Sequence, residues 1–282
     1  MLRERIAEDI FVFTSERYLQ VTACAILCGD RAVVIDTLPF PQETREMKQF
    51  IDKRATIDYV ILTHHQPDHI YGAYLLGGEL IAHERCRRIL QRDGERVLKA
   101  DAAQNHELAE VQIRLPEMLL DRGEITLHIG KKTLTIFHTP GHTTDSISVY
   151  VREDKILVAG DLVMPVPYIV GGDINEMRQS LMMINDLPLE NIVQGHGEVL
   201  LRGEIARTIE SSLKYLDAIE SKVMARVKKG ASLQSLGRIH IESCHKSRIP
   251  LNGMAEQLHQ ANMQYLYRLF ASKEDPKGLE DL

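Results

Sequence analysis

Six consecutive residues hold the densest group of potential metal ligands in this chain. The segment His64-His65-Gln66-Pro67-Asp68-His69 follows an apolar run at residues 59–62, which predicts a buried strand. Imidazole nitrogens and carboxylate oxygens are the donors that zinc and iron bind in proteins. Three histidines and an aspartate at the end of a strand therefore predict a transition-metal site.

Three more apolar runs end in potential ligands. They stop just before His142, Asp161 and His196, and each of these residues stands next to a glycine. A glycine lets the backbone turn sharply after a strand. Because binding sites in α/β proteins gather at strand ends, we expect these three side chains to converge on the first cluster.

The four segments together resemble the metallo-β-lactamase-fold superfamily, over roughly residues 8–200. The family pattern is Thr-His-x-His-x-Asp-His, followed by Pro-Gly-His-Thr, Gly-Asp and Gly-His. The chain carries, in the same order, Thr63-His64-His65-Gln66-Pro67-Asp68-His69, Pro140-Gly141-His142-Thr143, Gly160-Asp161 and Gly195-His196. The resemblance implies an α/β (α+β) fold: a four-layer αββα sandwich with a dinuclear metal cleft at one edge.

The resemblance also implies roles for individual residues. His64 and His142 would hold the first metal, and Asp161 would bridge the two metals. The second metal would be held by Asp68, His69 and His196. Asp68 and Asp161 are the expected catalytic residues, with Asp68 orienting the nucleophile or accepting its proton.

Gln66 departs from the family pattern, which has a second histidine at this position. An amide oxygen is a weaker ligand than imidazole, so the first site should lose affinity for zinc. Three outcomes are open: a weakened dinuclear site, one metal at the second site, or a facial triad. That triad of His64, His142 and Asp161 suits mononuclear iron, and iron persulfide dioxygenases of the superfamily use these positions.

His65 is not expected to replace the missing ligand, because neighbours in an extended segment point in opposite directions. Two other residues have two possible roles each. Asp36 supports the metal-binding loop through a hydrogen bond to a ligating histidine, or serves only as a strand-end turn. Tyr168 donates to a developing oxyanion, or packs at the rim. His138 and the remaining histidines are expected to be structural.

The pattern of apolar residues predicts β-rich and helical segments, repeated twice and followed by helices. We expect a catalytic domain at residues 1–202, with a cap or insertion at 93–123, and a C-terminal helical extension at 203–282. Strands are expected at 10–13, 22–27, 32–35, 59–62, 80–82, 125–129, 133–137, 146–151, 156–159 and 191–194. Helices are expected at 43–51, 67–76, 83–90, 173–187, 205–227 and 254–270, with a frayed end from Lys273.

Composition excludes several classes of protein. The 282 residues are 44% hydrophobic and 26% charged, as in globular proteins, and the net charge of −6 argues against a nucleic-acid partner. No apolar run is long enough to span a bilayer, and the charged start shows no secretory signal, so a cytoplasmic location is expected. The four cysteines have no disulfide or zinc-knot spacing, so we expect free thiols.

Three functions remain open. The first is a metal-dependent hydrolase of a small ester, thioester or lactone, using one or two zinc ions, with iron or manganese as other candidates. The second is an iron-dependent persulfide dioxygenase. The third is a non-catalytic protein that binds a metal or ligand at an eroded site. A small-molecule substrate is expected, and the apolar face at 205–227 could pack on the sandwich or form a homodimer.

Overall fold

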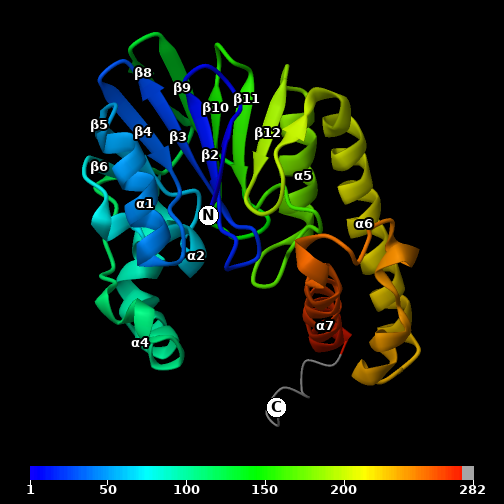
Figure 1. Cartoon of the computed structure of the whole chain (residues 1–282). Helices are drawn as coiled ribbons and strands as arrows, with labels where there is room; N and C mark the ends of the chain where they lie inside the picture. The colour runs from blue at the N-terminus through cyan, green and yellow to red at the C-terminus, as the bar shows by residue number, and fades with distance from the viewer. Residues whose placement is uncertain (275–282) are drawn as a thin grey trace.

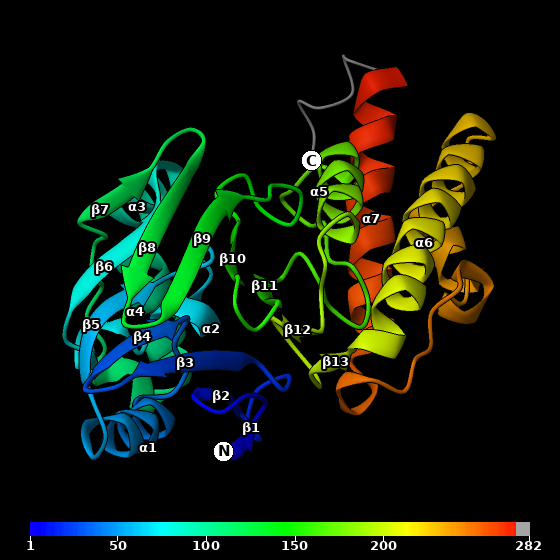
Figure 2. The same ribbon diagram turned by 90° about the horizontal axis from the view of Figure 1, so that it is seen from above.

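Two β-sheets lie face to face, and helices cover the outer side of each sheet (Figure 1). The computed structural model describes residues 1–274. Seen from above, the order of layers is helices, first sheet, second sheet, helices (Figure 2). This is the predicted αββα sandwich.

The first sheet has seven strands in sequential order. Strands β1 to β4 pair antiparallel, and β4 to β7 pair parallel. Parallel neighbours end at the same edge, so the residues after β4 and β5 emerge together. The bounds are β1 (Leu2–Arg5), β2 (Ile10–Thr14), β3 (Thr22–Cys28), β4 (Arg31–Ile35), β5 (Thr56–Ile61), β6 (Glu79–His83) and β7 (Met118–Leu120).

The second sheet has six strands in the order β13-β12-β11-β10-β9-β8. Only β11 and β12 pair parallel, which brings the segments after them together. The bounds are β8 (Glu124–Ile129), β9 (Lys132–His138), β10 (Ile147–Val151), β11 (Ile156–Gly160), β12 (Asn191–Gln194) and β13 (Leu200–Leu201).

The helices divide between the two outer faces. On the side of the first sheet lie α1 (Pro41–Asp52), α2 (Pro67–Ile70), α3 (Glu84–Ile89) and α4 (Glu95–Gln104), all labelled in Figure 2. On the side of the second sheet lie α5 (Ile174–Asn185), α6 (Arg202–Lys228) and α7 (Ala255–Glu274). Local sequence explains two helix starts: Pro41 occupies the first turn of α1, and the Asp173 carboxylate caps α5 by accepting from two backbone N–H groups.

Three apolar cores correspond to the three interfaces between the four layers. Strand β3 shows the principle, because Ala23 and Ala25 face the helices of the first sheet while Cys24 and Ile26 face the second sheet. A strand covered on both sides reads as a continuous apolar run. The four cysteines are buried free thiols, as predicted.

Most predicted elements are confirmed, and one is corrected. The helix expected at 67–76 is instead the short α2 and a 3₁₀ turn at Ala73–Leu75. Residues 93–123, expected to form a cap or insertion, contain α4, a 3₁₀ turn and β7. The end expected to fray from Lys273 is helical to Glu274, and the rest of that prediction falls outside the described residues. None of the described helices is both long and apolar enough to cross a membrane.

Candidate metal centre

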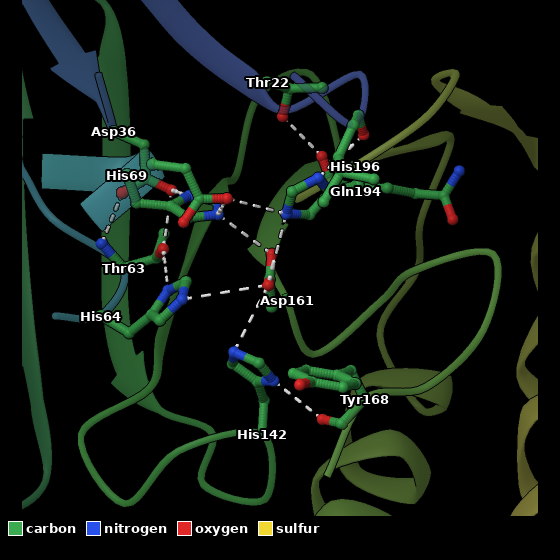
Figure 3. Close-up of polar contacts among 12 residues, drawn as sticks. Thr22, Asp36, Thr63, His64, His69, His142, Asp161, Tyr168, Gln194 and His196 are labelled. Carbon is green, nitrogen blue, oxygen red and sulfur yellow. Dashed lines mark hydrogen bonds and ion pairs between the residues drawn. The ribbon is translucent and has the colours of Figure 1, made fainter. Parts of the chain in front are cut away.

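The four ligand-bearing loops meet at one edge of the sandwich (Figure 3). They follow β5, β9, β11 and β12, so both sheets contribute. Two groups of donor atoms form, each with its atoms within 4.8 Å of one another. The first group is His64, His142 and Asp161, and the second is Asp68, His69 and His196. The structure thus brings together all six predicted ligands.

Asp161 lies between the two groups. Its Oδ2 is 3.4 Å from His142 Nε2 and 3.5 Å from His196 Nε2. Its Oδ1 is 3.2 Å from His69 Nε2, while His64 Nε2 is 3.9 Å from Oδ2. One carboxylate therefore contacts histidines of both groups, which is the geometry a bridging ligand needs.

Each of the four histidines is oriented through its Nδ1 atom. His142 donates to the Tyr168 carbonyl at 2.8 Å, and His196 donates to the Leu19 carbonyl at 2.9 Å. A carbonyl only accepts, so Nδ1 carries the hydrogen. Their Nε2 atoms then point toward Asp161, and in the neutral form of each imidazole this atom carries the lone pair that a cation would bind.

The donor set fits a metal ion. His64, His69 and His142 each have a buried Nε2 with no hydrogen-bond partner, and so does Oδ1 of Asp161. All four side chains are at most 3% exposed. Unpaired buried polar atoms are costly, and four of them aimed at one place indicate a missing partner. Imidazole and carboxylate donors suit zinc, iron or manganese.

The protonation of the histidines differs between the groups. Burial lowers the pKa of His64 well below its ordinary value and also lowers the pKa of His142. Burial acts in the same direction on His196, but Asp161 and Asp68 outweigh it and raise its pKa to about 10. His69 likewise has a pKa well above its ordinary value, because Asp161 and Asp36 outweigh burial.

The two aspartates remain ionised. Burial raises the pKa of Asp68, but His69 and His196 outweigh it and bring the value to about 2. Burial is likewise outweighed at Asp161, where neighbouring imidazoles hold the pKa well below its ordinary value. The centre therefore offers anionic oxygens to a cation.

Asp36 binds the loop that carries the first ligands. Its carboxylate accepts from the Thr63 backbone N–H and hydroxyl, both at 2.7 Å, and from His69 Nδ1 at 2.8 Å. Because the Thr63 hydroxyl donates to Asp36, it accepts from His64 Nδ1 at 3.0 Å. One buried carboxylate thus orients His69 directly and His64 through Thr63.

Two glycines leave room for these contacts. A Cβ on Gly195 would lie 1.9 Å from Asp161 Oδ1, so only glycine fits beside that carboxylate. Gly160 has a φ of +52°, and a Cβ there would lie 2.7 Å from Thr63 Oγ1. Gly160 therefore supplies the expected sharp turn, whereas Gly195 supplies space.

A cavity of about 610 Å³ opens beside the centre. Gln66, Asp68 and Tyr168 line it together with Asp161 and His196. The segment predicted as a cap contributes Val97, Asp101, Gln104, Asn105 and Leu108, and α7 contributes Leu258. Both the 93–123 segment and α7 therefore border the cavity beside the centre.

Other predicted residues lie away from the centre or at its margin. His65 turns away, as expected, and its Nδ1 is 2.8 Å from Asp145 Oδ1. His138 stacks on His83 with ring centroids 4.3 Å apart, so it is outside both ligand groups. The Tyr168 ring lies 5.8 Å from the His142 ring, and burial raises the pKa of its phenol.

Sequence reasoning missed several groups that orient the ligands. Thr63 is the first residue of the His-rich motif at residues 63–69, yet no role was predicted for its hydroxyl. The Leu19 and Tyr168 carbonyls were missed because a backbone oxygen has no signature in a sequence. Leu19 and Gln20 both have positive φ angles, of 45° and 52°, although neither residue type signals such a turn.

Two facing sheets, with a histidine and aspartate centre at the strand ends, define the class of the protein. The chain matches the family model of the metallo-beta-lactamase superfamily over residues 19–221. It therefore belongs to the metallo-beta-lactamase superfamily.

The chain is similar to curated proteins that carry different names. The chain is 29% identical over 175 residues to a beta-lactamase-like protein 2 homolog of Drosophila melanogaster, covering 61% of this chain and 56% of that protein. It is 26% identical over 167 residues to a hydroxyacylglutathione hydrolase of Rhodopseudomonas palustris, covering 58% of each chain. The matched region thus spans little more than half the length of these relatives.

A solved structure resembles the chain over nearly its whole length. It is a metallo-beta-lactamase family protein from Thermus thermophilus, with a TM-score of 0.69 and 16% sequence identity. The match covers 96% of this chain and 95% of that one. At this identity the likeness supports the fold alone.

Proposed function

We propose that this protein is a metal-dependent hydrolase of a small ester, thioester or lactone. The observation that carries the proposal is the set of six buried donor side chains beside a cavity. A thioester hydrolase among its relatives is in keeping with this reaction class. The proposal takes residues 1–202 as the catalytic domain and residues 203–282 as a helical extension.

The six ligands would hold one or two zinc ions, with iron or manganese as other candidates. When bound, such an ion acidifies a water molecule and polarises a carbonyl oxygen. Asp68 lines the cavity and carries a carboxylate that stays ionised, so it can orient the attacking water and accept its proton. The Tyr168 phenol stays protonated and faces the same cavity, so it can donate to the oxygen that gains charge.

The test combines metal analysis with a substrate panel. Purified protein is assayed for zinc, iron and manganese and then for hydrolysis of S-lactoylglutathione, short acyl-coenzyme A thioesters, aryl esters and lactones. We expect at least one bound ion and turnover of one substrate class, both abolished by a chelator and by Asp161→Asn. A fully metal-loaded protein that hydrolyses none of these compounds would argue for a non-catalytic role.

A second candidate is an iron-dependent persulfide dioxygenase. The first ligand group contains two histidines and one carboxylate, which is the ligand set of mononuclear non-haem iron. Gln66 lines the cavity together with Asp161, and because its amide is neutral it adds no charge to this set. Oxygen consumption with glutathione persulfide by the iron-loaded protein would favour this candidate, and preference for zinc with no oxygen uptake would exclude it.

A further inference from the structure

The segment Pro167-Tyr168-Ile169 lies between β11 and α5. It contacts both a histidine of the metal centre and the cavity beside it. The Tyr168 carbonyl accepts from Nδ1 of His142 at 2.8 Å. The Tyr168 ring lines the cavity (Figure 3). The position of this one residue therefore sets both the direction of a ligand and the place of a possible donor.

Asn262 of α7 holds the residues on either side of Tyr168. Its Nδ2 donates to the Pro167 carbonyl at 2.7 Å, and its Oδ1 accepts from the Ile169 backbone N–H at 2.9 Å. The side chain is completely buried. One amide thus pairs with the backbone before and after the carbonyl that orients His142.

Asn262 is itself fixed by a buried network. Its second Nδ2 hydrogen is donated to the Tyr215 hydroxyl at 3.0 Å, and that oxygen is 3.1 Å from His259 Nδ1. Nε2 of His259 is 3.0 Å from the Ile239 carbonyl, where it donates. These contacts join α6, α7 and the turns between them, so the C-terminal helices hold the amide rigidly.

We propose that Asn262 is a positioning residue for His142 and Tyr168, so that α7 forms part of the support of the metal centre. The inference rests on the ligand set proposed above. Two simultaneous bonds to a peptide segment require a donor and an acceptor in one side chain, which asparagine provides. An aspartate of the same shape has no N–H, and its carboxylate would face the Pro167 carbonyl unpaired.

The chain supplies a matched control on the same helix. The Tyr265 hydroxyl donates to the Gly172 carbonyl at 2.9 Å, so it also ties α7 to the segment that precedes α5. The Gly172 backbone N–H donates to the Ile169 carbonyl at 3.0 Å, whereas the Tyr168 carbonyl accepts from His142, so the bond from Tyr265 does not involve the carbonyl that orients His142. Tyr265→Phe therefore removes a bond of similar kind without releasing the group that orients His142.

The first experiment reads the imidazole directly in the metal-free protein, so it requires neither turnover nor bound metal. Long-range ¹H–¹⁵N spectra assign the tautomer of His142, with His142→Gln to identify its signals. We expect one Nδ1–H tautomer in the wild type and in Tyr265→Phe, and a mixture in Asn262→Asp and Asn262→Ser. A single Nδ1–H tautomer in folded Asn262 variants would overturn the proposal.

The second experiment measures Co²⁺ binding against a competing chelator, with the visible spectrum as the readout. Loss of such supporting hydrogen bonds lowers metal affinity by about 10–100-fold. We expect that loss for the first ligand group in Asn262→Asp, with the second group and Tyr265→Phe unchanged. Equal weakening in Asn262→Asp and Tyr265→Phe would mean that Asn262 acts only on general stability.

A third measurement uses the wild type alone, in case the Asn262 variants fail to fold. If the amide holds this segment, the Ile169 backbone N–H exchanges with solvent as slowly as the buried N–H groups of α7. Exchange at the rate of an exposed loop would overturn the proposal. If both zinc binding and hydrolysis are absent, this result and the tautomer of His142 still decide the role of Asn262.

Discussion

The two ligand groups differ in charge although they share one cleft. The second group contains its own carboxylate, Asp68, and the pKa values of its two histidines are raised. The histidines of the first group have lowered pKa values, and Asp161 is their only carboxylate partner within the group. Asp36, Asp68 and Asp161 therefore all act on the second group, whereas Asp161 is the one carboxylate within the first.

Each group has one histidine oriented by a backbone carbonyl, so the difference in support lies in Asp36, which contacts His69 directly and His64 only through Thr63. His69 of the second group is oriented by the Asp36 carboxylate, which belongs to the first sheet. His142 of the first group is oriented by a backbone carbonyl whose segment is held from the C-terminal helices. A carboxylate adds charge as well as direction, whereas a carbonyl adds direction alone. We therefore expect the second group to bind a cation more tightly.

Asp161→Asn should have the largest effect, because this carboxylate contacts histidines of both groups. The amide keeps the size but removes the charge and places an N–H group among metal ligands. We expect metal affinity to fall by about 100-fold or more at both groups, by analogy with lost ligand support. Elemental analysis after dialysis against a weak chelator measures it, and retention of a full metal complement would contradict the bridging role.

Asp36→Asn should weaken the second group more than the first. The substitution removes the charge beside His69 and disturbs the Thr63 hydroxyl that meets His64. An affinity loss of about 10–100-fold is expected, measured by competition with a chelating dye. Glu43→Gln is the matched control, because Glu43 is also a buried carboxylate bonded to a hydroxyl, that of Ser15, at 2.9 Å. Equal losses in both variants would contradict a specific role for Asp36.

Gln66→His should bring the zinc affinity of the first ligand group closer to that of the second. The substitution restores the imidazole of the family pattern next to the first group. We expect its affinity for zinc to rise about tenfold or more, because imidazole is the stronger ligand. Isothermal titration with Zn²⁺ measures this, and Gln104→His, at another position lining the cavity, serves as the control. An unchanged first site in Gln66→His would mean that residue 66 does not reach the metal.

The last prediction concerns the stability of the folded chain. The dependence of that stability on pH can be measured apart from metal binding. Burial lowers the pKa of His83 to about 4, from an ordinary value of 6.5. Between these values the unfolded chain binds more protons, so this histidine's contribution to stability is full above pH 6.5 and is lost as the pH falls toward 4.

His83→Asn should remove this contribution while keeping an acceptor for the first turn of α3. The wild type should lose about 1 kcal/mol more per pH unit than the variant across this interval. Urea unfolding at several pH values measures the difference. If the free energy of unfolding changes equally with pH in the two proteins, His83 is not the source of the pH dependence.

The six side chains could be singled out from sequence because each follows an apolar run and matches a motif of the family that the chain resembles, and their role as ligands stays a prediction. The structure explains why the segments before His142, Asp161 and His196 meet: β9 and β11 both pair antiparallel with β10 and so run in the same direction, and β12 is parallel to β11. The role of Asn262 could not be predicted from sequence, because it bonds to the backbone of Ile169 and Pro167, which lie 93 and 95 residues away. Strand β1 was missed because its exposed residues, Leu2 to Arg5, show no alternation.

Each ligand group draws on both halves of the sandwich. His64, Asp68 and His69 come from the half built on the first sheet, and His142, Asp161 and His196 come from the other. A bound ion would therefore act as a non-covalent cross-link between the two sheets, in addition to the apolar side chains packed between them. An ion that binds only the native state stabilises it more as the ion concentration rises. The same ion would therefore both stabilise the fold and complete the proposed active site.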